Sequence, residues 1–504
     1  MLIKIAARKS DLARLQAYQV GKALKEKNPE ISIQYQFRES LGDKNLTDPL
    51  WKIPEKGVFT EDFMRDLLNG DADLVVHSWK DLPTDEKQET FIAATLPRAD
   101  QRDLLLMKKS ANGLGDLQIF SSSPRREYNL TTLLPQLLPW KTNLIQFQSV
   151  RGNIQTRIKK LMNENTVHGL VLAKAALDRL LTFNDLEFSE EFKQTQDFLN
   201  ACLTDLNWMV LPLSENPTAA AQGAIAIEIR RDRKDLIDLL AKINDKDTFH
   251  AASYERKLLK NYGGGCHLAL GMSHLKDRNY DVTFLKGKTP QGNVVHEKYL
   301  NHLNQKELPK FKPNELWSIQ TEFISRQKNV LIESLDISCG YIVSRLDAWP
   351  KELLSDSNKY KIWTSGVSTW KKMAEIGVWV YGTFDSFGDQ QNPQTEAFWG
   401  RIVWKTLTHA RHPFLDSKKH IATYEISFND FGIDKQKFFY WRSSSQFLEA
   451  LSQFPEILEA YHACGPGSTL LTLRDHIPSD KVYIYLNEQN WRMQCQTEYL
   501  IKNT

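Results

Sequence analysis

Segments with strand-like and helix-like patterns alternate along the first 200 residues, and this alternation restricts the fold more than any other feature of the chain. Residues 2–7 (LIKIAA) predict a strand. The following segment has the apolar spacing of a helix that Ser10 can cap, and ISIQYQF alternates as a second strand does. The same order returns from LQIFSSS at 117–123 to HGLVLAK at 168–174. Repeated β-α-β order predicts an α/β protein with substantial parallel sheet.

The chain is too long for one hydrophobic core. It has 504 residues, whereas single cores stop growing near ~250–300 residues, so several domains are expected. The composition changes in the last third, because nine of the 13 Trp residues follow residue 300. We therefore place the major domain boundary at residues 338–340.

Charge and cysteine content exclude several classes of protein. The chain has 65 Lys and Arg against 62 Asp and Glu, and a net charge of +3 does not favour a nucleic-acid coat or a membrane-surface protein. Five cysteines without a CxxC pair indicate a reducing compartment. The start has no signal-peptide pattern, and no apolar run approaches the ~20 residues that span a bilayer. We expect a cytoplasmic monomer with no membrane, nucleic-acid or metal partner.

The motif HSWKDLP follows the strand-like segment DADLVV and places Lys80 and Asp81 where that strand ends. In open α/β sheets, ligands bind beyond the carboxyl ends of the strands. Asp81 could carry a proton or stabilise a cation there. The alternative is that Asp81 is a turn residue or the partner of a salt bridge.

The motif SSSPRRE places hydroxyl groups before a helix. Ser123 can cap this helix, Pro124 suits its first position, and the exposed amide groups can bind an anion. Arg125 and Arg126 follow, and guanidinium groups bind carboxylates through two hydrogen bonds. The alternative is a capped helix with two solvated arginines.

The motif VRGNIQTR has a similar layout. Arg151 ends a strand, Gly152 permits a tight turn, and Asn153 can cap a helix that carries Arg157 in its first turn. An ordinary strand-to-helix turn is the alternative. Cations also end other predicted strands, and together they indicate a small polyanionic ligand. They are Arg8, Lys80, Arg125, Arg126 and Arg151. A phosphate ligand is less favoured, because neither GxxxxGK[ST] nor GxGxxG occurs.

The motif YGGGCHLALG ends a predicted helix with three glycines and then Cys266. A thiol on a glycine loop suits covalent attachment of a group that must shift position. His267 alone is adjacent and no second cysteine is near, which argues against a metal at this motif. A buried small residue after a turn is the alternative.

Seven motifs in this order resemble the hydroxymethylbilane synthase (porphobilinogen deaminase) family over about residues 1–336. They are AARKS, KGVF, HSWKDLP, SSPRR, VRGN, QGAIAIE and GGGC. The resemblance implies a transferase that condenses four porphobilinogen molecules head to tail with loss of ammonia and releases hydroxymethylbilane. Growth takes place on a dipyrromethane cofactor, which is held through a thioether to the cysteine that matches Cys266.

The resemblance also implies a role for individual residues. Asp81, with Lys80, matches the catalytic position, and Gln222 matches a position near the hinge. The matched cofactor-binding residues are Cys266, Arg8, Ser10, Asp43, Lys80, Ser122, Arg125, Arg126, Arg151 and Gly152. The matched substrate-binding residues are Arg8, Arg126, Arg151, Arg157, Arg179, Lys52 and Lys56. Segment 43–58 is expected to be the loop that shifts during chain growth.

The family fold implies three α/β domains, two of which resemble the lobes of periplasmic binding proteins. We expect residues 1–98 with 207–243 in the first lobe, 99–206 in the second lobe, and 244–336 in the cofactor-attachment domain. The sequence departs from the family at Leu41, where the family has an arginine, and at Trp79, where it has a methionine. Leu41 puts one cofactor contact in doubt, and Trp79 could alter the packing behind Asp81.

Residues 340–504 show strand–Ser/Thr–helix–Gly patterns similar to the halves of uroporphyrinogen-III synthase, so we expect an additional α/β domain. Tyr424, in ATYEIS, matches a tyrosine of that family. The segment has about 165 residues, which is shorter than that family's two-lobed fold. Ring closure of the linear product, a structural or scaffolding descendant, and an unrelated domain all stay open.

Two other classes of function compete with the transferase. A non-catalytic two-lobed protein that binds a polycarboxylate would share the fold, but it gives no reason for Asp81 beside Lys80 or for Cys266 after three glycines. A nucleic-acid-binding protein would need a basic surplus or a recognisable motif, and this chain has neither.

Overall fold

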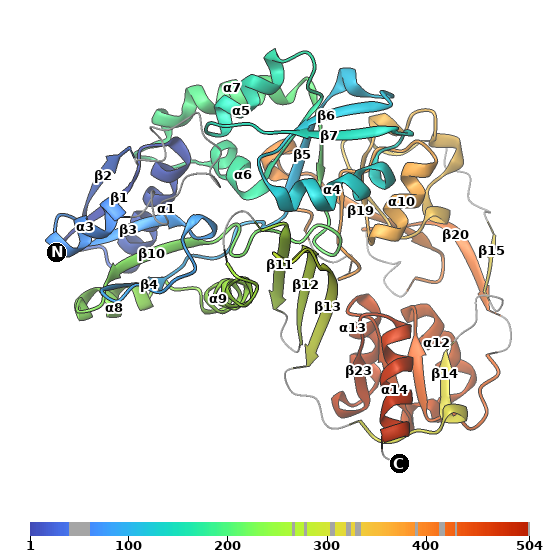
Figure 1. Cartoon of the computed structure of the whole chain (residues 1–504). Helices are drawn as coiled ribbons and strands as arrows, with labels where there is room; N and C mark the ends of the chain where they lie inside the picture. The colour runs from blue at the N-terminus through green and yellow to red at the C-terminus, as the bar shows by residue number, and fades with distance from the viewer. Residues whose placement is uncertain are drawn as a thin grey trace.

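The computed structural model contains two lobes, a smaller third domain and a C-terminal region with two further sheets (Figure 1). It describes residues 1–39, 61–264, 268–276, 280–302, 308–318, 324–327, 334–388, 392–412, 419–428 and 431–501. None of the helices in these ranges is long and apolar enough to cross a membrane.

The first lobe is a five-stranded sheet in the order β2-β1-β3-β10-β4. Its strands are β1 (Leu2–Arg8), β2 (Ser32–Arg38), β3 (Leu74–Ser78), β4 (Thr90–Ala94) and β10 (Ile225–Arg230). Strand β1 runs parallel to β2 and β3, whereas β10 is antiparallel to both of its neighbours. Its helices are α1 (Asp11–Lys27), α3 (Glu61–Asn69) and α8 (Lys234–Ala241). The carboxyl ends of β1 and β3 therefore lie at the same edge of the sheet.

The second lobe has a sheet of the same size in the order β7-β6-β8-β5-β9. Its strands are β5 (Asp103–Lys108), β6 (Asp116–Phe120), β7 (Leu144–Gln148), β8 (Gly169–Ala173) and β9 (Leu206–Val210). Its helices are α4 (Pro124–Leu137), α5 (Ile154–Asn163), α6 (Lys174–Thr182) and α7 (Lys193–Leu203). Strand β9 pairs with β5, so the chain returns to the first lobe after Val210, later than the predicted residue 207.

The third domain packs α9 (Lys246–Asn261) against an antiparallel sheet. The strands are β11 (Leu270–Lys276), β12 (Tyr280–Lys288) and β13 (Val294–His302). Gly271 of β11 lies so close to the Pro217 carbonyl that an added Cβ would come within 2.1 Å of the oxygen. A glycine at this position lets the domain approach the segment that links the two lobes.

The C-terminal region has two mainly parallel sheets. The first, ordered β15-β20-β19-β16-β17-β18, is made of β15 (Ile324–Gln327), β16 (Gly340–Val343), β17 (Lys361–Thr364), β18 (Gly382–Thr383), β19 (Trp404–His409) and β20 (His420–Phe428). The second, ordered β14-β21-β22-β23, is made of β14 (Leu316–Ser318), β21 (Phe438–Trp441), β22 (Tyr461–Cys464) and β23 (Val482–Ile484). The helices are α10 (Val367–Glu375), α11 (Glu396–Trp399), α12 (Ser444–Gln453), α13 (Ser468–His476) and α14 (Glu488–Ile501).

This arrangement differs from the boundary expected at residues 338–340. Strand β14 pairs with β21, and β15 pairs with β20, so both belong to the C-terminal sheets and not to the domain of α9. They are too short to carry a periodic pattern, and tertiary pairing alone reveals their place. With these two strands the C-terminal region contains two sheets. Its length of about 165 residues had suggested that it was too short for a two-lobed fold.

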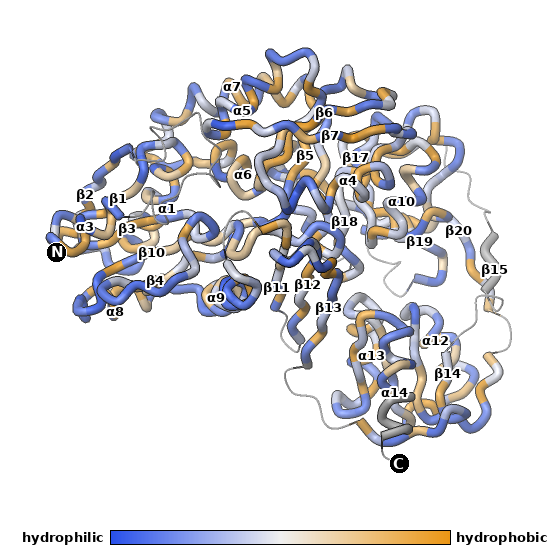
Figure 2. Tube along the Cα trace, viewed as in Figure 1, coloured by the Kyte–Doolittle hydropathy of each residue, from blue (hydrophilic) through white to orange (hydrophobic). Residues whose placement is uncertain are grey.

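Tryptophans join the C-terminal region to the second lobe. The indole of Trp370 on α10 donates to the Leu137 carbonyl of α4 at 3.1 Å, and the indole of Trp379 donates to the Trp208 carbonyl at 3.1 Å. Figure 2 shows hydrophobic residues along β5, in the sheet of the second lobe. One buried apolar cluster includes residues from both parts, among them Trp349, Trp370 and Trp379 of the C-terminal region.

Candidate active site

A buried carboxylate organises the cations that follow the strands. Asp103, at the start of β5, has no exposed surface and accepts from Arg125 at 2.9 Å and Arg126 at 2.7 Å. Gln222 and Asn216 also donate to it, at 2.9 and 3.0 Å. Burial alone would raise the pKa of Asp103, but the two guanidinium groups hold it far below its ordinary value. The group is therefore a permanent anion that positions both arginines.

Both arginines of the motif also bind groups within the protein. Arg125 is buried, and its Nη1 donates to Asp103, to Asn216 at 3.4 Å and to the Pro217 carbonyl at 2.8 Å. Its Nη1 is therefore bonded within the protein, and the predicted contact with the cofactor stays a prediction. Arg126 donates to Asp103 and to the Val171 carbonyl, while its buried Nε has no hydrogen-bond partner among the described residues.

Asp81 lies in the loop that leaves the first sheet. It ends a 3-10 turn, Trp79–Asp81, directly after β3, and its side chain is exposed. Arg8, Ser10 and Asp81 line one small pocket between the ends of β1 and β3. Ser10 precedes α1 as expected, but its side chain makes no capping hydrogen bond. The structure thus brings together three of the residues that the motifs predicted.

Lys80 lies between this pocket and the arginines. Its Nζ donates to the Gln222 side chain at 3.3 Å. Burial lowers the pKa of Lys80, Asp81 opposes this shift, and the charge of Arg126 adds to it. Gln222 bridges Lys80 to Asp103, so one hydrogen-bonded chain connects the loop after β3 with the second lobe.

Further cations come from the strand-to-helix turns of the second lobe. Ser123 and Asn153 cap α4 and α5 through their side chains, as predicted. Arg157 donates to the Gly152 carbonyl at 2.8 Å. Burial lowers its pKa to about 10, with Arg126 and Arg151 adding to the shift and Asp81 opposing it. These charges therefore lie near one another, at the edge of the sheet where an anionic ligand would neutralise them.

Ser122 and Arg179 have contacts within the protein. The Ser122 hydroxyl donates to the Val150 carbonyl at 2.6 Å, so it joins the ends of β6 and β7. Arg179 is buried, and its Nη2 donates to the Gly223 carbonyl in the segment between the lobes at 2.7 Å. Burial lowers the pKa of Arg179 to about 10. This contact supports the link between the lobes, and the predicted contact of Arg179 with substrate stays a prediction.

Two adjacent residues of α9 that the motifs did not single out make hydrogen bonds near the site, and one of them, Arg256, holds the Asp81 loop. Arg256 of α9 donates to the carbonyls of Trp79 and Leu82, both at 3.1 Å, and to the Pro83 carbonyl. Its neighbour Glu255 is fully buried. Glu255 accepts two hydrogen bonds from Arg98, at 2.8 and 2.7 Å, and others from the backbone. An adjacent acid and base inside a predicted helix, in SYERKLL, is the only sequence signal for this pair.

The glycine loop after α9 approaches the same place. An added Cβ on Gly264 would lie 2.7 Å from the Thr84 hydroxyl, and Thr84 follows Asp81 by three residues. The other predicted site residues lie outside the described residues. They are Leu41, Asp43, Lys52, Lys56, Cys266 and segment 43–58.

Comparison with known proteins identifies the family. A family model described as porphobilinogen deaminase, dipyromethane cofactor binding domain, matches residues 3–238. The porphobilinogen deaminase of Clostridium novyi (strain NT) is 33% identical over 302 residues, which cover 59% of this chain and 92% of that protein. This chain belongs to the porphobilinogen deaminase family. The family expected from the motifs is thereby confirmed, together with its dipyrromethane cofactor domain.

Another relative is the porphobilinogen deaminase of Syntrophomonas wolfei, which is 38% identical over 270 residues, covering 53% of this chain and 78% of that protein. Among solved structures, the periplasmic aliphatic sulphonate binding protein SsuA from Escherichia coli covers 52% of this chain and 70% of its own, at 11% identity and a TM-score of 0.25. We draw no conclusion from that weak similarity. The family model ends before the C-terminal region.

A buried ion pair below the Asp81 loop predicts an acid-sensitive contribution to stability. Glu228 of β10 accepts from Lys87 at 2.7 Å and lies 3.0 Å from the His77 imidazole. Burial alone would raise the pKa of Glu228, but His77 and Lys87 lower it from 4.5 to about 2. A lowered carboxyl pKa adds stability that is complete above pH 4.5 and is lost as the pH falls toward 2.

We therefore expect Glu228→Gln to be less stable than wild type at pH 7, and the difference to shrink by about 1.4 kcal/mol at pH 3.5. Urea unfolding at both pH values measures this difference. Glu89→Gln, an exposed change on the adjoining loop, is the control and should behave as wild type. A difference between wild type and Glu228→Gln that does not vary with pH would contradict the role of this ion pair.

Proposed function

We propose that this protein is a hydroxymethylbilane synthase. It joins four porphobilinogen molecules head to tail with loss of ammonia on a covalently held dipyrromethane, and hydrolysis then releases hydroxymethylbilane. The observation that carries the proposal is the position of Asp81, in one pocket with Arg8 and Ser10 and beside Lys80, in a chain of the deaminase family.

The charges of the site fit the cofactor and the substrate. Each pyrrole ring of these molecules has an acetate and a propionate, so a growing chain accumulates carboxylates. Arg126 and Arg151 lie near enough to Arg157 for their charges to lower its pKa. Several positive charges at one place favour an anionic ligand. We propose that these residues, with Arg8, bind the carboxylates. The dipyrromethane supplies the pyrrole position at which chain growth begins, and Cys266 is proposed to hold it.

Asp81 is proposed to handle protons at the reacting ring. Loss of ammonia from porphobilinogen needs a proton on the amine, and it leaves a cationic ring that a nearby carboxylate stabilises. The exposed Asp81 can face the substrate, while Arg256 and the Lys80–Gln222 hydrogen bond keep its loop in place. Asp103, Arg125 and Arg179 act as positioning residues, because their contacts lie within the protein.

The first experiment combines product analysis with intact mass. The purified protein is incubated with porphobilinogen, and the porphyrin isomers are identified after acidification and oxidation. We expect uroporphyrin together with an added mass of two porphobilinogen units less their ammonia. Cys266→Ser should lack both the added mass and the product. An unmodified chain that consumes no porphobilinogen would instead support the two-lobed binding protein.

We also propose, as a second candidate function, ring closure by the C-terminal region. The carboxyl ends of its two parallel sheets face each other: Ser445, at the start of α12, lies 3.4 Å from the His409 imidazole at the end of β19. An added Cβ on Gly467, before α13, would lie 3.3 Å from the Ser386 carbonyl. Ligands bind at such ends in α/β sheets. Uroporphyrin III as the main isomer would support this function, whereas uroporphyrin I alone would exclude it.

A further inference from the structure

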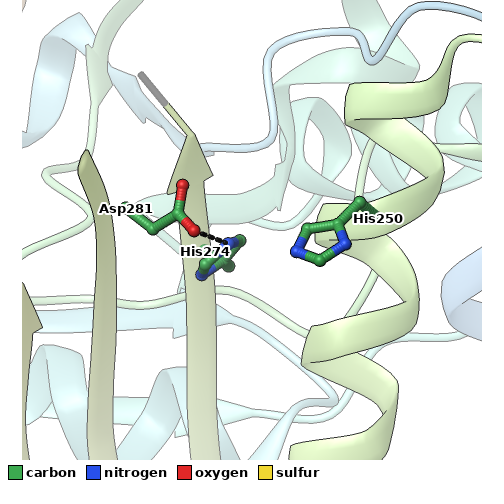
Figure 3. Close-up of side chains that lie close together, drawn as sticks. All are labelled: His250, His274 and Asp281. Atoms are coloured by element: carbon green, nitrogen blue, oxygen red, sulfur yellow. Dashed lines mark ion pairs between the residues drawn. The ribbon is translucent and has the colours of Figure 1, made fainter. Parts of the chain in front are cut away.

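Three ionisable side chains converge in the third domain, and none of them is among the predicted active-site residues. His250 projects from α9, His274 from β11 and Asp281 from β12, and all three point toward a common space (Figure 3). One nitrogen or oxygen atom from each residue lies within 4.8 Å of the others. Such a group of two imidazoles and one carboxylate can hold a metal ion.

Among the residues that the structure describes, two atoms of this group are buried and find no hydrogen-bond partner. They are Nε2 of His274 and Oδ1 of Asp281, on side chains of residues that are only 3% and 7% exposed. Buried polar atoms are nearly always paired in folded proteins. The distance from His274 Nε2 to Asp281 Oδ2 is 3.7 Å, which is longer than a hydrogen bond. An atom between the two side chains would satisfy both.

The surroundings of His274 favour a free lone pair on Nε2. Its other ring nitrogen, Nδ1, lies 3.0 Å from the Thr283 hydroxyl. When that hydroxyl accepts a hydrogen bond, the proton is on Nδ1 and Nε2 can bind a metal. Metal-binding histidines commonly have a second hydrogen bond of this kind, which fixes the ring. Tyr254 packs on the same ring with a centroid distance of 4.5 Å, so the imidazole is oriented on two sides.

We propose that His250, His274 and Asp281 bind a divalent transition-metal ion, with Zn²⁺ as the best match. Imidazole and carboxylate are ordinary ligands of Zn²⁺, whereas Mg²⁺ and Ca²⁺ prefer oxygen ligands alone. Three protein ligands leave a position for water, and the exposed His250 is on the side that water can reach. This differs from the sequence-based expectation of no metal, because that expectation considered only ligands close together in the sequence.

The metal would stabilise the packing of α9 on β11 and β12, and α9 contacts the Asp81 loop. Helix α9 carries both Glu255, which holds the backbone of Ala221 and His274, and Arg256, which holds the Asp81 loop. An ion that ties α9 to β11 and β12 would fix these contacts relative to the third domain. The role is therefore structural, and it is independent of which reaction the active site performs.

The test uses the full-length holoprotein, treated with a chelator and then titrated with Co²⁺, with Zn²⁺ as the competitor. We expect the wild type to show the visible absorption of a bound Co²⁺ ion and to lose it when Zn²⁺ is added. His250→Ala should bind one equivalent less and lose the absorption that belongs to that equivalent. Thr283→Val should weaken binding about 10–100-fold, as expected when a ligand loses its orienting hydrogen bond. Zn²⁺ should raise the melting temperature of the wild type but not of His250→Ala.

His296→Ala is the matched control, because His296 is an exposed histidine of β13 outside the group. It should bind Co²⁺ as the wild type does. His412 and His420, whose rings stack at 4.6 Å, could bind a second ion, so the comparison rests on the equivalent lost in His250→Ala. The proposal is wrong if wild type and His250→Ala give the same absorption and stoichiometry, or if neither binds Co²⁺.

Discussion

Asp81→Asn is expected to lower the rate of porphobilinogen consumption by about 10²–10⁴-fold, the usual contribution of a positioned acid or base. Asparagine has nearly the same size, but it can neither give up a proton at neutral pH nor stabilise a cationic ring with a full charge. Because Asp81 is exposed and the hydrogen bonds of Arg256 go to backbone carbonyls, the melting temperature should not change. Steady-state rates and thermal unfolding of the same preparation provide both values.

Glu86→Gln is the control for this prediction, because Glu86 is an exposed acid five residues further along the same loop. It should retain wild-type activity. This result would show that the effect of Asp81→Asn comes from that one carboxylate and not from a general loss of negative charge on the loop. A variant Asp81→Asn with nearly full activity would show that another group handles the proton. Loss of activity together with a lower melting temperature would instead assign Asp81 a structural role.

The local elements of the two lobes could be predicted from the sequence because their signals lie within a few residues. Ser123 with Pro124, and Asn153 after Gly152, predicted the starts of α4 and α5, and both side chains form the capping hydrogen bonds. The order of strands and helices predicted α/β lobes. The end of a strand depends on the strand that it pairs with, which the sequence does not show. The predicted return to the first lobe at residue 207 is therefore too early, because β9 pairs with β5 up to Val210.

The partners of Arg125 and Arg126 within the protein could not be predicted. Arg125 and Arg126 are adjacent in the sequence and chemically the same, yet their contacts are set by Asp103, a residue 22 positions before Arg125. No local pattern marks Asp103 as the partner of both. The same limit applies to Arg256, because only the folded chain brings α9 against the loop after β3.

The proposed metal-binding residues also could not be predicted from the sequence. His250, His274 and Asp281 come from a helix and two strands and follow no short spacing motif. A search for neighbouring cysteines and histidines therefore missed them. The buried atoms without partners, which identify the group, can be recognised only in three dimensions.

Trp370→Ala is expected to lower the free energy of unfolding by about 3–5 kcal/mol, the usual cost of truncating a buried tryptophan. Trp370 has no exposed surface, and its indole donates to the Leu137 carbonyl across the boundary between α10 and α4. The change therefore leaves a cavity and an unpaired carbonyl between the C-terminal region and the second lobe. Urea unfolding, followed by circular dichroism and by tryptophan fluorescence, measures the loss.

The same experiment decides whether the C-terminal region is part of the folding unit that contains the active site. Both sides contribute to one apolar cluster, so Trp370→Ala should shift a single transition by both probes, and deaminase activity should disappear at the same urea concentration. Ile376→Ala, at an exposed position that ends α10, should leave the transition in place. If Trp370→Ala instead gives two transitions, with activity lost only in the one at higher urea, the C-terminal region unfolds alone. The tryptophans would then attach a separate domain without supporting the deaminase.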